Sequence, residues 1–435
     1  MIDRPYLKKL LSPQEWLPRF VFWGGALVVG AVAVLFALGA QMSYKFFHWL
    51  LSVSPWLPFI VMPSGLALCV WLSKRFFEGS QGSGIPQTIA ALEIENEGQL
   101  GKLLSLRIAA GKILITFLAL CSGASVGREG PTVQIGASIM YSLRKFTNFS
   151  QQNQLRGLII AGGAAGVAAA FNTPLAGIAF AIEELSRSFE QRTNGLVLTG
   201  IIFAGLASNA ILGDYTYFGT VSTSLGSASA WLAVLMCSLV GGLLGGGFAR
   251  LLISAGIGWG GIVGRWMRAR PIAFAALCGL VLAVIGVLSG HHTYGTGYDE
   301  VHAILANGDS GYESYGLMKL LATVVSYLSG TPGGLFAPSL AVGAGFGANL
   351  SHLIPFVPAT TVIVLGMVAY FAGVTQAPLT AFIIVMEMTD NHDLVLPLMA
   401  TALAAHGVSR IVCHEPLYKA MAERFLHRQP RPQAD

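Results

Sequence analysis

The sequence predicts an all-α polytopic membrane protein. Only 11% of its 435 residues are charged, whereas a water-soluble domain needs about a quarter. The mean hydropathy is +0.64, and several uncharged runs reach about 19 residues, enough for a helix to cross a roughly 30 Å hydrocarbon core. These runs cover residues 21–40, 55–73, 216–249 and 271–290. The same composition excludes soluble globular folds, disordered chains, collagen and coiled coils.

Basic residues gather at the two ends of the chain. They are Arg4, Lys8, Lys9 and Arg19 before the first apolar run, and Lys419, Arg424, Arg428 and Arg431 after the last. By the positive-inside rule we expect both termini to be cytoplasmic, with residues 1–20 as an N-terminal segment and residues 419–435 as a short tail without a regulatory domain. The net charge of +5 would also suit nucleic acid, but the basic residues do not gather on one face, so no nucleic-acid partner is expected.

The cysteine and histidine patterns predict no metal site. The five cysteines stand singly, without a C-x-x-C pair or a Cys/His ligand spacing, and are expected to fill the core or face lipid. The loop at residues 290–298 contains adjacent histidines, His291 and His292, without a spaced third ligand, and we assign no site to it. No cofactor is expected.

Two apolar stretches are interrupted by proline. Residues 161–182 are split at Asn172-Thr173-Pro174, and residues 357–386 are split at residues 375–378, Thr-Gln-Ala-Pro. Proline ends a helix or starts one. Irregular backbone at membrane depth is tolerated only where protein or a wet cavity covers it, because lipid cannot hydrogen-bond to free amides. Both breaks are therefore predicted to face the interior.

The motifs recur in the second half of the chain. Residues 127–131, Gly-Arg-Glu-Gly-Pro, match residues 334–338, Gly-Leu-Phe-Ala-Pro, at an offset of 207, and residues 174–183 match residues 378–387 at an offset of 204. Two motifs that agree on nearly one offset indicate an internal duplication, and paired breaks of this kind are typical of a substrate site near the bilayer midplane. The pattern leaves open whether the halves run parallel or inverted. The expected transmembrane repeats are residues 21–215 and 216–418.

Each Gly-x-x-x-Pro element predicts a loop that leads into a helix N-terminus. Glycine can take a positive φ, and proline suits the first helical turn. A helix N-terminus carries unpaired N–H groups and about half a positive charge, so several converging ends would bind a small anion without a buried cation. Residues 82–86, Gly-Ser-Gly-Ile-Pro, have the same form with a hydroxyl added. An ordinary turn at a membrane boundary is the alternative there.

Three acidic residues lie beside these apolar segments, where a carboxylate costs roughly 2.5–3.5 kcal/mol on insertion scales. Glu129 stands at a predicted helix N-terminus. When ionised it can compete with an anion, and when protonated it can leave; a capping role paired with Arg128 is the alternative. Glu183 and Glu184 end an uncharged half-helix, and an interfacial pair facing water is the alternative for them.

Two further side chains have open interpretations. Lys112, within residues 107–120, is either a buried counter-ion or a lysine that snorkels to the interface. Tyr418 follows the last apolar segment, and its hydroxyl could donate to an anion. From the sequence alone, a place in the interfacial aromatic belt is favoured for Tyr418.

Four motifs in this order resemble the signature of the CLC family of chloride channels and transporters. They are Gly82-Ser83-Gly84-Ile85-Pro86, Gly127-Arg128-Glu129-Gly130-Pro131, Gly333-Gly334-Leu335-Phe336-Ala337-Pro338 and Pro416-Leu417-Tyr418, supported by the blocks 172–185 and 377–390. The resemblance covers essentially the whole chain. It implies a multi-pass homodimer in the lipid of the cell (inner) membrane, and in each subunit an anion pathway built from two inverted halves with tilted, broken helices.

The resemblance also implies a central anion site. Ser83, in the loop that begins at Gly82, and Tyr418 would hold the anion with their hydroxyl groups. The backbone amides of Leu335 and Phe336 would assist them. Ser83 favours chloride, since the nitrate-preferring branch carries proline at this position and the fluoride exporters carry methionine.

By the same resemblance, Glu129 would be the external gating glutamate. The outer site that it vacates would be formed by the amides of Arg128, Gly130 and Ala337. Glu184 would be the internal glutamate that handles protons, with Glu183 beside it. Because family members that act as passive channels usually lack an acid at this position, Glu184 favours exchange.

We therefore predict a secondary active H⁺/Cl⁻ antiporter that moves chloride across the membrane in exchange for protons and is gated by a glutamate. A passive chloride-selective channel is the alternative. An enzyme is not expected, because neither a Gly-x-Ser-x-Gly elbow nor a His-Glu-x-x-His helix is present. A scaffold is not expected either, because broken helices with intramembrane acids lower packing stability without structural gain.

Two departures from the family pattern are visible. The segment between Pro86 and Gly127, which includes residues 93–98, is a few residues longer than in bacterial exchangers, and this leaves the geometry of that loop open. The chain also lacks the paired nucleotide-binding regulatory domains of animal members, so we expect no control by adenine nucleotides.

Overall fold

The computed structural model describes residues 13–146, 152–186, 195–213, 215–225, 230–258, 261–308, 311 and 313–427. Within these ranges the chain is helical and contains no β-strand, as the predicted all-α fold class requires. In chain order the helices are α2 (Pro13–Val53), α3 (Pro58–Phe76), α4 (Ile85–Glu93), α5 (Glu97–Leu103), α6 (Leu106–Cys121), α7 (Glu129–Ser142), η1 (Leu143–Lys145), α8 (Gln152–Phe171), α9 (Pro174–Phe180), η2 (Ala181–Ser186), α10 (Gly195–Leu212), α11 (Trp231–Gly258), α12 (Gly261–Ala269), α13 (Pro271–Leu288), α14 (Tyr298–Asn307), α15 (Tyr315–Leu328), α16 (Phe336–Ser351), α17 (Ala359–Thr375), α18 (Pro378–Thr389), α19 (Val395–Val412) and α20 (Leu417–His427).

Among the described residues, seven helical segments are long and apolar enough to cross a membrane. They are Trp16–Val53, Pro58–Phe76, Glu97–Cys121, Gln154–Phe171, Trp231–Gly256, Pro271–Leu288 and Val395–Val412. The shorter apolar helices α10, α15, α17 and α18 lie between them along the chain. The chain is therefore a multi-pass membrane protein.

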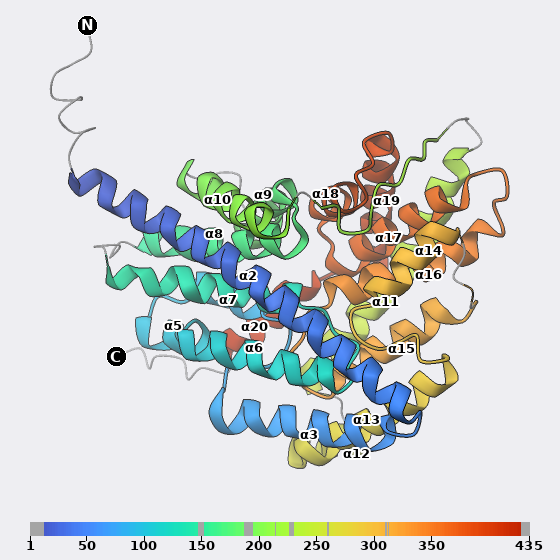
Figure 1. Ribbon diagram of the computed structural model, residues 1–435, viewed down its shortest axis with the longest axis horizontal. Coiled ribbons are helices and arrows are strands. Elements are labelled where there is room, and N and C mark those ends of the chain that lie inside the picture. Colours follow the sequence, from blue (N-terminus) through green and yellow to red (C-terminus); the bar gives the residue numbers. More distant parts are fainter. Residues whose placement is uncertain are drawn as a thin grey trace, which may run out of the picture.

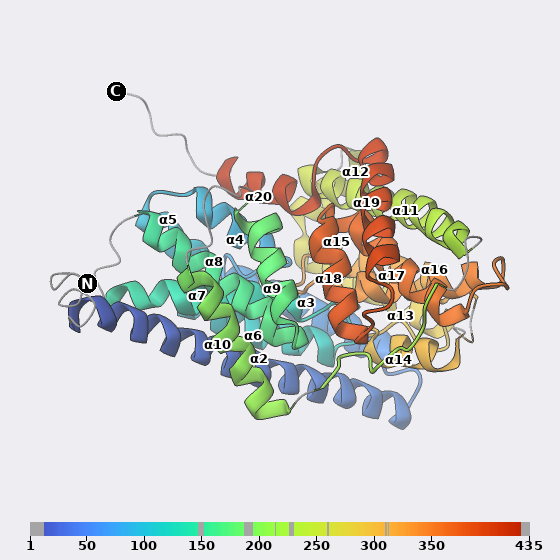
Figure 2. The same cartoon turned by 90° about the horizontal axis from the view of Figure 1, so that it is seen from above.

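The two halves of the chain lie side by side. Helices α5, α7, α8 and α10 occupy one side of the molecule in both views, and α11, α14, α16 and α17 occupy the other (Figures 1 and 2). Helices α9 and α18 meet between them, and α20, near the C-terminal end, returns to pack on α4 of the first half. The last helix therefore completes the packing of the first half.

Helix α2 is longer than the uncharged run that predicts it. The run covers residues 21–40, whereas the helix continues through Lys45 to Val53 and is 41 residues long. At 1.5 Å per residue it measures about 60 Å, roughly twice the hydrocarbon thickness, so it must tilt in a membrane. Figure 1 shows α2 as the long oblique helix of the first half. It ends just before Pro55, where the ring would clash with a continuing helix.

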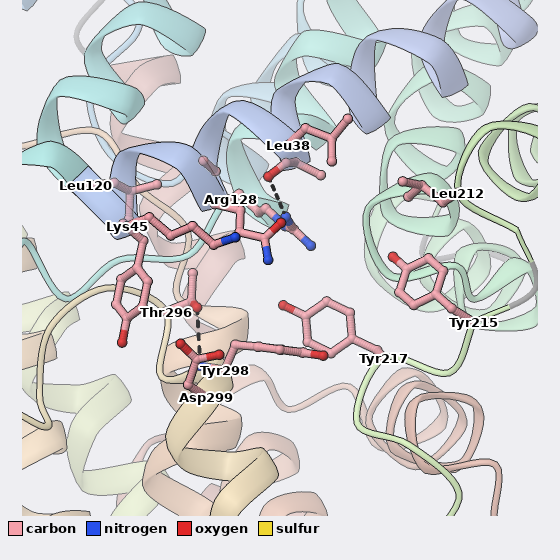
Figure 3. A pocket seen from close by; sticks show the side chains of 14 residues that line it. Leu38, Lys45, Leu120, Arg128, Leu212, Tyr215, Tyr217, Thr296, Tyr298 and Asp299 are labelled. Carbon is pink, nitrogen blue, oxygen red and sulfur yellow. Dashed lines mark hydrogen bonds between the residues drawn. The ribbon is translucent and has the colours of Figure 1, made fainter. Parts of the chain in front are cut away.

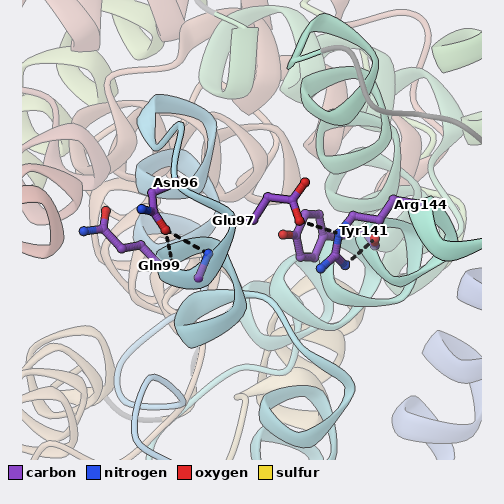
Figure 4. Close-up of polar contacts among 6 residues, drawn as sticks. Asn96, Glu97, Gln99, Tyr141 and Arg144 are labelled. Carbon is purple, nitrogen blue, oxygen red and sulfur yellow. Dashed lines mark hydrogen bonds and ion pairs between the residues drawn. The ribbon is translucent and has the colours of Figure 1, made fainter.

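The segment after α4 forms a short capped helix. The Asn96 Oδ1 accepts hydrogen bonds from the amides of Gly98, at 2.9 Å, and Gln99, at 3.3 Å, which fixes the start of α5. On the other side, the Glu97 carboxylate lies 3.9 Å from Arg144 Nε, and the Arg144 guanidinium stacks 3.9 Å from the centre of the Tyr141 ring (Figure 4). The loop whose geometry the sequence left open is thus held against the end of α7.

The second proline break lies inside the protein, as predicted, and the first is partly buried. Asn172 and Gln376 stand 204 residues apart and take nearly the same left-handed backbone, with φ of 57° and 56°. The Asn172 side-chain amide donates to the carbonyl of Tyr215, and the Gln376 side-chain amide donates to the carbonyl of Cys413. Thr173 is fully buried. The two breaks are therefore copies of one structural element.

The repeat extends to the close packing of helices. A Cβ atom added to Gly343 in α16 would lie 2.7 Å from the carbonyl oxygen of Gly366 in α17. A Cβ atom added to Gly366 would lie 2.7 Å from the carbonyl oxygen of Gly343. Gly136 in α7 and Gly162 in α8 face each other in the same way, 207 and 204 residues earlier. Small residues allow such helices to approach closely without lipid between them.

Candidate functional site

Two repeat-related glycines pair at the centre of the molecule. The Gly127 amide donates to the Gly334 carbonyl and the Gly334 amide donates to the Gly127 carbonyl, both at 2.7 Å, as an isolated antiparallel bridge. A Cβ on Gly334 would lie 2.9 Å from the amide nitrogen of Gly130. Reciprocal contacts between equivalent residues are the mark of a local two-fold axis. The pairing brings together the N-termini of α7 and α16.

Glu129, the first residue of α7, lies beside this bridge. Its exposed fraction is 0%, and neither carboxylate oxygen has a hydrogen-bond partner within the described ranges. The backbone amides of Arg128 and Ala337 nevertheless lie near enough to act on the carboxylate charge. Two of the three amides predicted for the outer site therefore surround Glu129 itself.

Arg128 does not pair with Glu129. Its Nη1 donates to the carbonyl of Ala37 at 2.8 Å, and its guanidinium lies 5.7 Å from the centre of the Tyr217 ring. In the part of the chain that the structure describes, no ion pair joins Arg128 to Glu129. The side chain of Arg128 thus turns away from the buried carboxylate, and the ion-paired cap considered as an alternative is not formed.

The hydroxyl groups of Ser83 and Tyr418 meet under the same helix ends. Ser83 Oγ lies against Gly130, where a Cβ could not fit, and the Tyr418 ring lies 5.9 Å from that of Phe336. Ser83 is 2% exposed and Tyr418 is 1% exposed, which excludes the interfacial belt for Tyr418. Neither hydroxyl has a hydrogen-bond partner among the residues described. Buried polar groups are normally satisfied, so two adjacent unsatisfied hydroxyls fit a site for an acceptor ligand such as an anion.

The loop that carries Ser83 is fixed from behind. Gly82 and Gly84 take positive φ values of 70° and 108°. Lys112 is fully buried, and its Nζ donates to the carbonyls of Ser80, at 2.7 Å, and Gly82, at 2.8 Å. Lys112 therefore does not snorkel, and the carbonyl of Gly82 is engaged by the lysine rather than by the site.

On the opposite side, Leu335 and Phe336 start α16 and are 2% and 1% exposed. Their amides belong to the first turn, where N–H groups lack partners within the helix. The structure therefore brings together Ser83, Tyr418, Phe336 and Glu129, an arrangement that the family resemblance implies and that the sequence alone did not favour for Tyr418.

Glu183 points elsewhere. Its carboxylate accepts hydrogen bonds from the amides of Leu379, at 3.1 Å, and Thr380, at 2.7 Å, and so caps the N-terminus of α18. Glu387 in α18 does the same for α9, accepting from Leu175 at 3.2 Å and Ala176 at 2.7 Å. The sequence expectations assign no role to Glu387, although this residue ends the matched motif at residues 378–387.

Glu184 faces the interior instead. It is 3% exposed and lies in η2, a π-helical turn that continues α9. Successive residues of a helical turn point in different directions, so Glu183 can reach α18 while Glu184 turns inward. Glu184 and Glu129 both lie in the neighbourhood of the Tyr418 hydroxyl. Tyr418 thus lies within electrostatic reach of both acids.

Paired half-helices that meet at a buried centre in an apolar bundle define an integral membrane transport protein. Residues 65–410 match the model of the family described as "Voltage gated chloride channel". The chain belongs to this family, which is the CLC family.

Known proteins with related sequences and structures are also CLC transporters. The chain is 30% identical over 424 residues to the H(+)/Cl(-) exchange transporter ClcA of Yersinia pestis, covering 92% of this chain and 83% of the relative. It is 30% identical over 382 residues to ClcA of Citrobacter koseri, covering 84% and 78%. A slow cyanobacterial Cl⁻/H⁺ antiporter has a TM-score of 0.79 at 29% identity, covering 97% of this chain and all of that one. A CLC-type fluoride/proton antiporter, at 23% identity, shares the fold with a TM-score of 0.77, covering 94% of this chain and 99% of that one.

Proposed function

We propose that this protein is a secondary active H⁺/Cl⁻ antiporter. The observation that carries the proposal is the meeting of Ser83, Tyr418 and the shielded Glu129 at the N-termini of α4, α7 and α16. The ClcA relatives and the cyanobacterial antiporter are named as H⁺/Cl⁻ exchangers. The protein moves ions and performs no enzymatic reaction.

Chloride would occupy the space between the hydroxyls of Ser83 and Tyr418, whose protons can both be donated to it. The amides of Leu335 and Phe336 would add the positive end of α16, and those of Arg128, Gly130 and Ala337 would form an outer position. An ionised Glu129 competes with chloride for that outer position. A protonated Glu129 loses this attraction and vacates it.

Protons would reach this centre through Glu184. It is buried within electrostatic reach of Tyr418, whereas Glu183 is occupied as the cap of α18. We therefore assign the proton-handling role to Glu184 and a supporting structural role to Glu183.

We place the protein in the cell (inner) membrane as a homodimer in contact with lipid and without a nucleic-acid partner. Residues 21–215 and 216–418 form its two repeats, and residues 1–20 and 419–435 are cytoplasmic. With this orientation the Arg128 side of Glu129 faces outward, and the CLC resemblance supports the same sidedness.

The test is chloride-driven proton movement in proteoliposomes at clamped voltage. Uphill proton movement is expected for the unmodified protein. Glu129→Gln and Glu184→Gln should abolish proton movement while chloride flux persists, and Glu95→Gln, on an exposed loop, should leave both intact. Chloride flux without proton movement in the unmodified protein would instead identify a passive channel.

A further inference from the structure

The second half of the chain contains a copy of the loop that carries Ser83. Residues 82–84 are Gly-Ser-Gly before α4, and residues 295–297 are Gly-Thr-Gly before α14. The outer glycines of both loops take positive φ: 70° and 108° at Gly82 and Gly84, and 60° and 84° at Gly295 and Gly297. Thr296 thus occupies the position that corresponds to Ser83.

Each loop is held by a buried lysine at the same position of the repeat. Lys319 in α15 stands 207 residues after Lys112 in α6, and both are 0% exposed. Lys319 Nζ donates to the carbonyls of Thr293 and Gly295, both at 2.9 Å, as Lys112 Nζ does to its own loop. The conformation of the second loop is therefore built into the fold.

The second loop lines a cavity of about 260 Å³. The opposite wall comes from the first half, with Lys45 of α2 and with Arg128, the residue before Glu129. Figure 3 shows the ends of Lys45 and Arg128 on one side, with Thr296, Tyr298 and the Tyr217 hydroxyl across from them. The cavity thus opens directly beside the N-terminus of α7.

The polar groups of the cavity suit an anion. Thr296 Oγ1 accepts a hydrogen bond from the Tyr298 amide at 3.3 Å, which leaves its hydroxyl proton free to donate. Arg128 Nε is shielded and unsatisfied within the described part of the chain. Asp299 also lines the cavity, so its single negative charge opposes the two positive charges.

We propose that this cavity is a further anion-binding site, which holds a monovalent inorganic anion beyond the outer position that Glu129 occupies. Its space fits a halide with several waters, because one water occupies about 30 Å³ of liquid. Two cations against one carboxylate favour a monovalent anion that exchanges readily over a multivalent one. The assignment of chloride as the occupant rests on the proposed function; the anion site itself rests on the cavity.

The site would raise the local chloride concentration at the outer mouth, as clefts of one predominant charge do. Lys45 and Asp299 lie away from the Ser83/Tyr418 centre, so their effect is on binding rather than on the exchange step. Removal of the Lys45 charge should raise the external chloride concentration for half-maximal exchange several-fold at an unchanged maximal rate. Asp299→Asn should lower that concentration.

The first test uses bromide as the probe in crystals of the full chain, located by its anomalous scattering. We expect one peak between Thr296 and Arg128 and another at Ser83 and Tyr418. Lys45→Gln and Thr296→Val should remove only the cavity peak, and Lys74→Gln, an exposed lysine elsewhere, should remove neither. A peak at Ser83 and Tyr418 alone in the unmodified protein would overturn the proposal.

The second test is the external chloride dependence of exchange for the same variants. The site is supported if Lys45→Gln raises and Asp299→Asn lowers the external chloride concentration for half-maximal exchange. Equal concentrations for the two variants would overturn it. The outcome also separates this proposal from the proposed function. A cavity peak in a protein that moves no protons would retain the anion site and reject exchange, whereas active exchange with an empty cavity would reject the site alone.

Discussion

Glu183 and Glu387 cap each other's helices. Each carboxylate accepts two backbone amides at the start of the half-helix that carries the other residue. Both follow a proline break and stand 204 residues apart. These reciprocal hydrogen bonds join the two halves of the chain at the contact between α9 and α18.

Glu387→Gln should therefore destabilise the protein about as much as Glu183→Gln. Each substitution weakens charge-assisted hydrogen bonds worth about 1.5–3 kcal/mol. Thermal unfolding in detergent should show similar losses for the two variants and none for exposed Glu95→Gln. A stable Glu183→Gln variant that has lost proton movement would instead make Glu183 a proton carrier.

Gly334→Ala should prevent assembly of the centre. The added Cβ would lie 2.9 Å from the Gly130 amide nitrogen and 3.2 Å from the Gly127 carbonyl, and this backbone cannot move without breaking the central bridge. Gly247→Ala in α11 is the matched control, since a Cβ there meets nothing within 4 Å among the described residues. We expect loss of folded protein in gel filtration for the first variant only. Normal yield and flux from Gly334→Ala would contradict the assigned crowding.

Tyr418→Phe should weaken chloride binding about tenfold, measured by calorimetry, because it removes one hydroxyl donor worth about 1.4 kcal/mol. Tyr370→Phe is its control. The Tyr370 hydroxyl is equally buried and also unsatisfied among the described residues, but its ring packs against Phe248 and Phe346 instead. Equal affinities for the two variants would remove Tyr418 from the anion site.

The stability of the loop around α14 should fall as pH rises. The pKa of Glu300 is raised to about 7, mainly by burial. The charge of Lys319 opposes this shift, and the adjacent Asp299 adds to it. The pKa of this carboxyl is higher in the folded state than in the unfolded state. Its contribution to stability is therefore fully present below the unfolded-state pKa and is lost as the pH rises through the folded-state pKa of about 7. Thermal unfolding between pH 4.5 and pH 7.5 should show this trend, and Glu300→Gln should flatten it. An unchanged slope in the variant would assign the trend to other groups.

Much of the fold could be predicted because the duplication leaves local marks. The proline breaks at Asn172 and Gln376 and the matched motifs that contain Gly127 and Gly334 are visible in the sequence. The structure gives the two breaks the same left-handed backbone and pairs the two glycines. Composition likewise predicts a membrane bundle. The length of α2 could not be predicted, because hydropathy follows the charge at Lys45 while the helix continues until Pro55.

The site was harder to predict because side chains of similar sequence context point in different directions. Glu183 and Glu184 are neighbours, yet one caps α18 and the other is buried near Tyr418. No site is expected in the loop at residues 290–298, because its adjacent histidines lack a spaced third ligand. The signal in that loop is the tripeptide Gly295-Thr296-Gly297, which repeats the pattern of residues 82–84.

The reciprocal caps also set the order in which the chain can be completed during synthesis. The amides of Leu175 and Ala176 receive their acceptor from Glu387, and those of Leu379 and Thr380 receive theirs from Glu183. During synthesis, about 200 further residues must be added after α9 before Glu387, which caps this half-helix, is present. The amides of Leu175 and Ala176 therefore lack this acceptor until the second half has been synthesised.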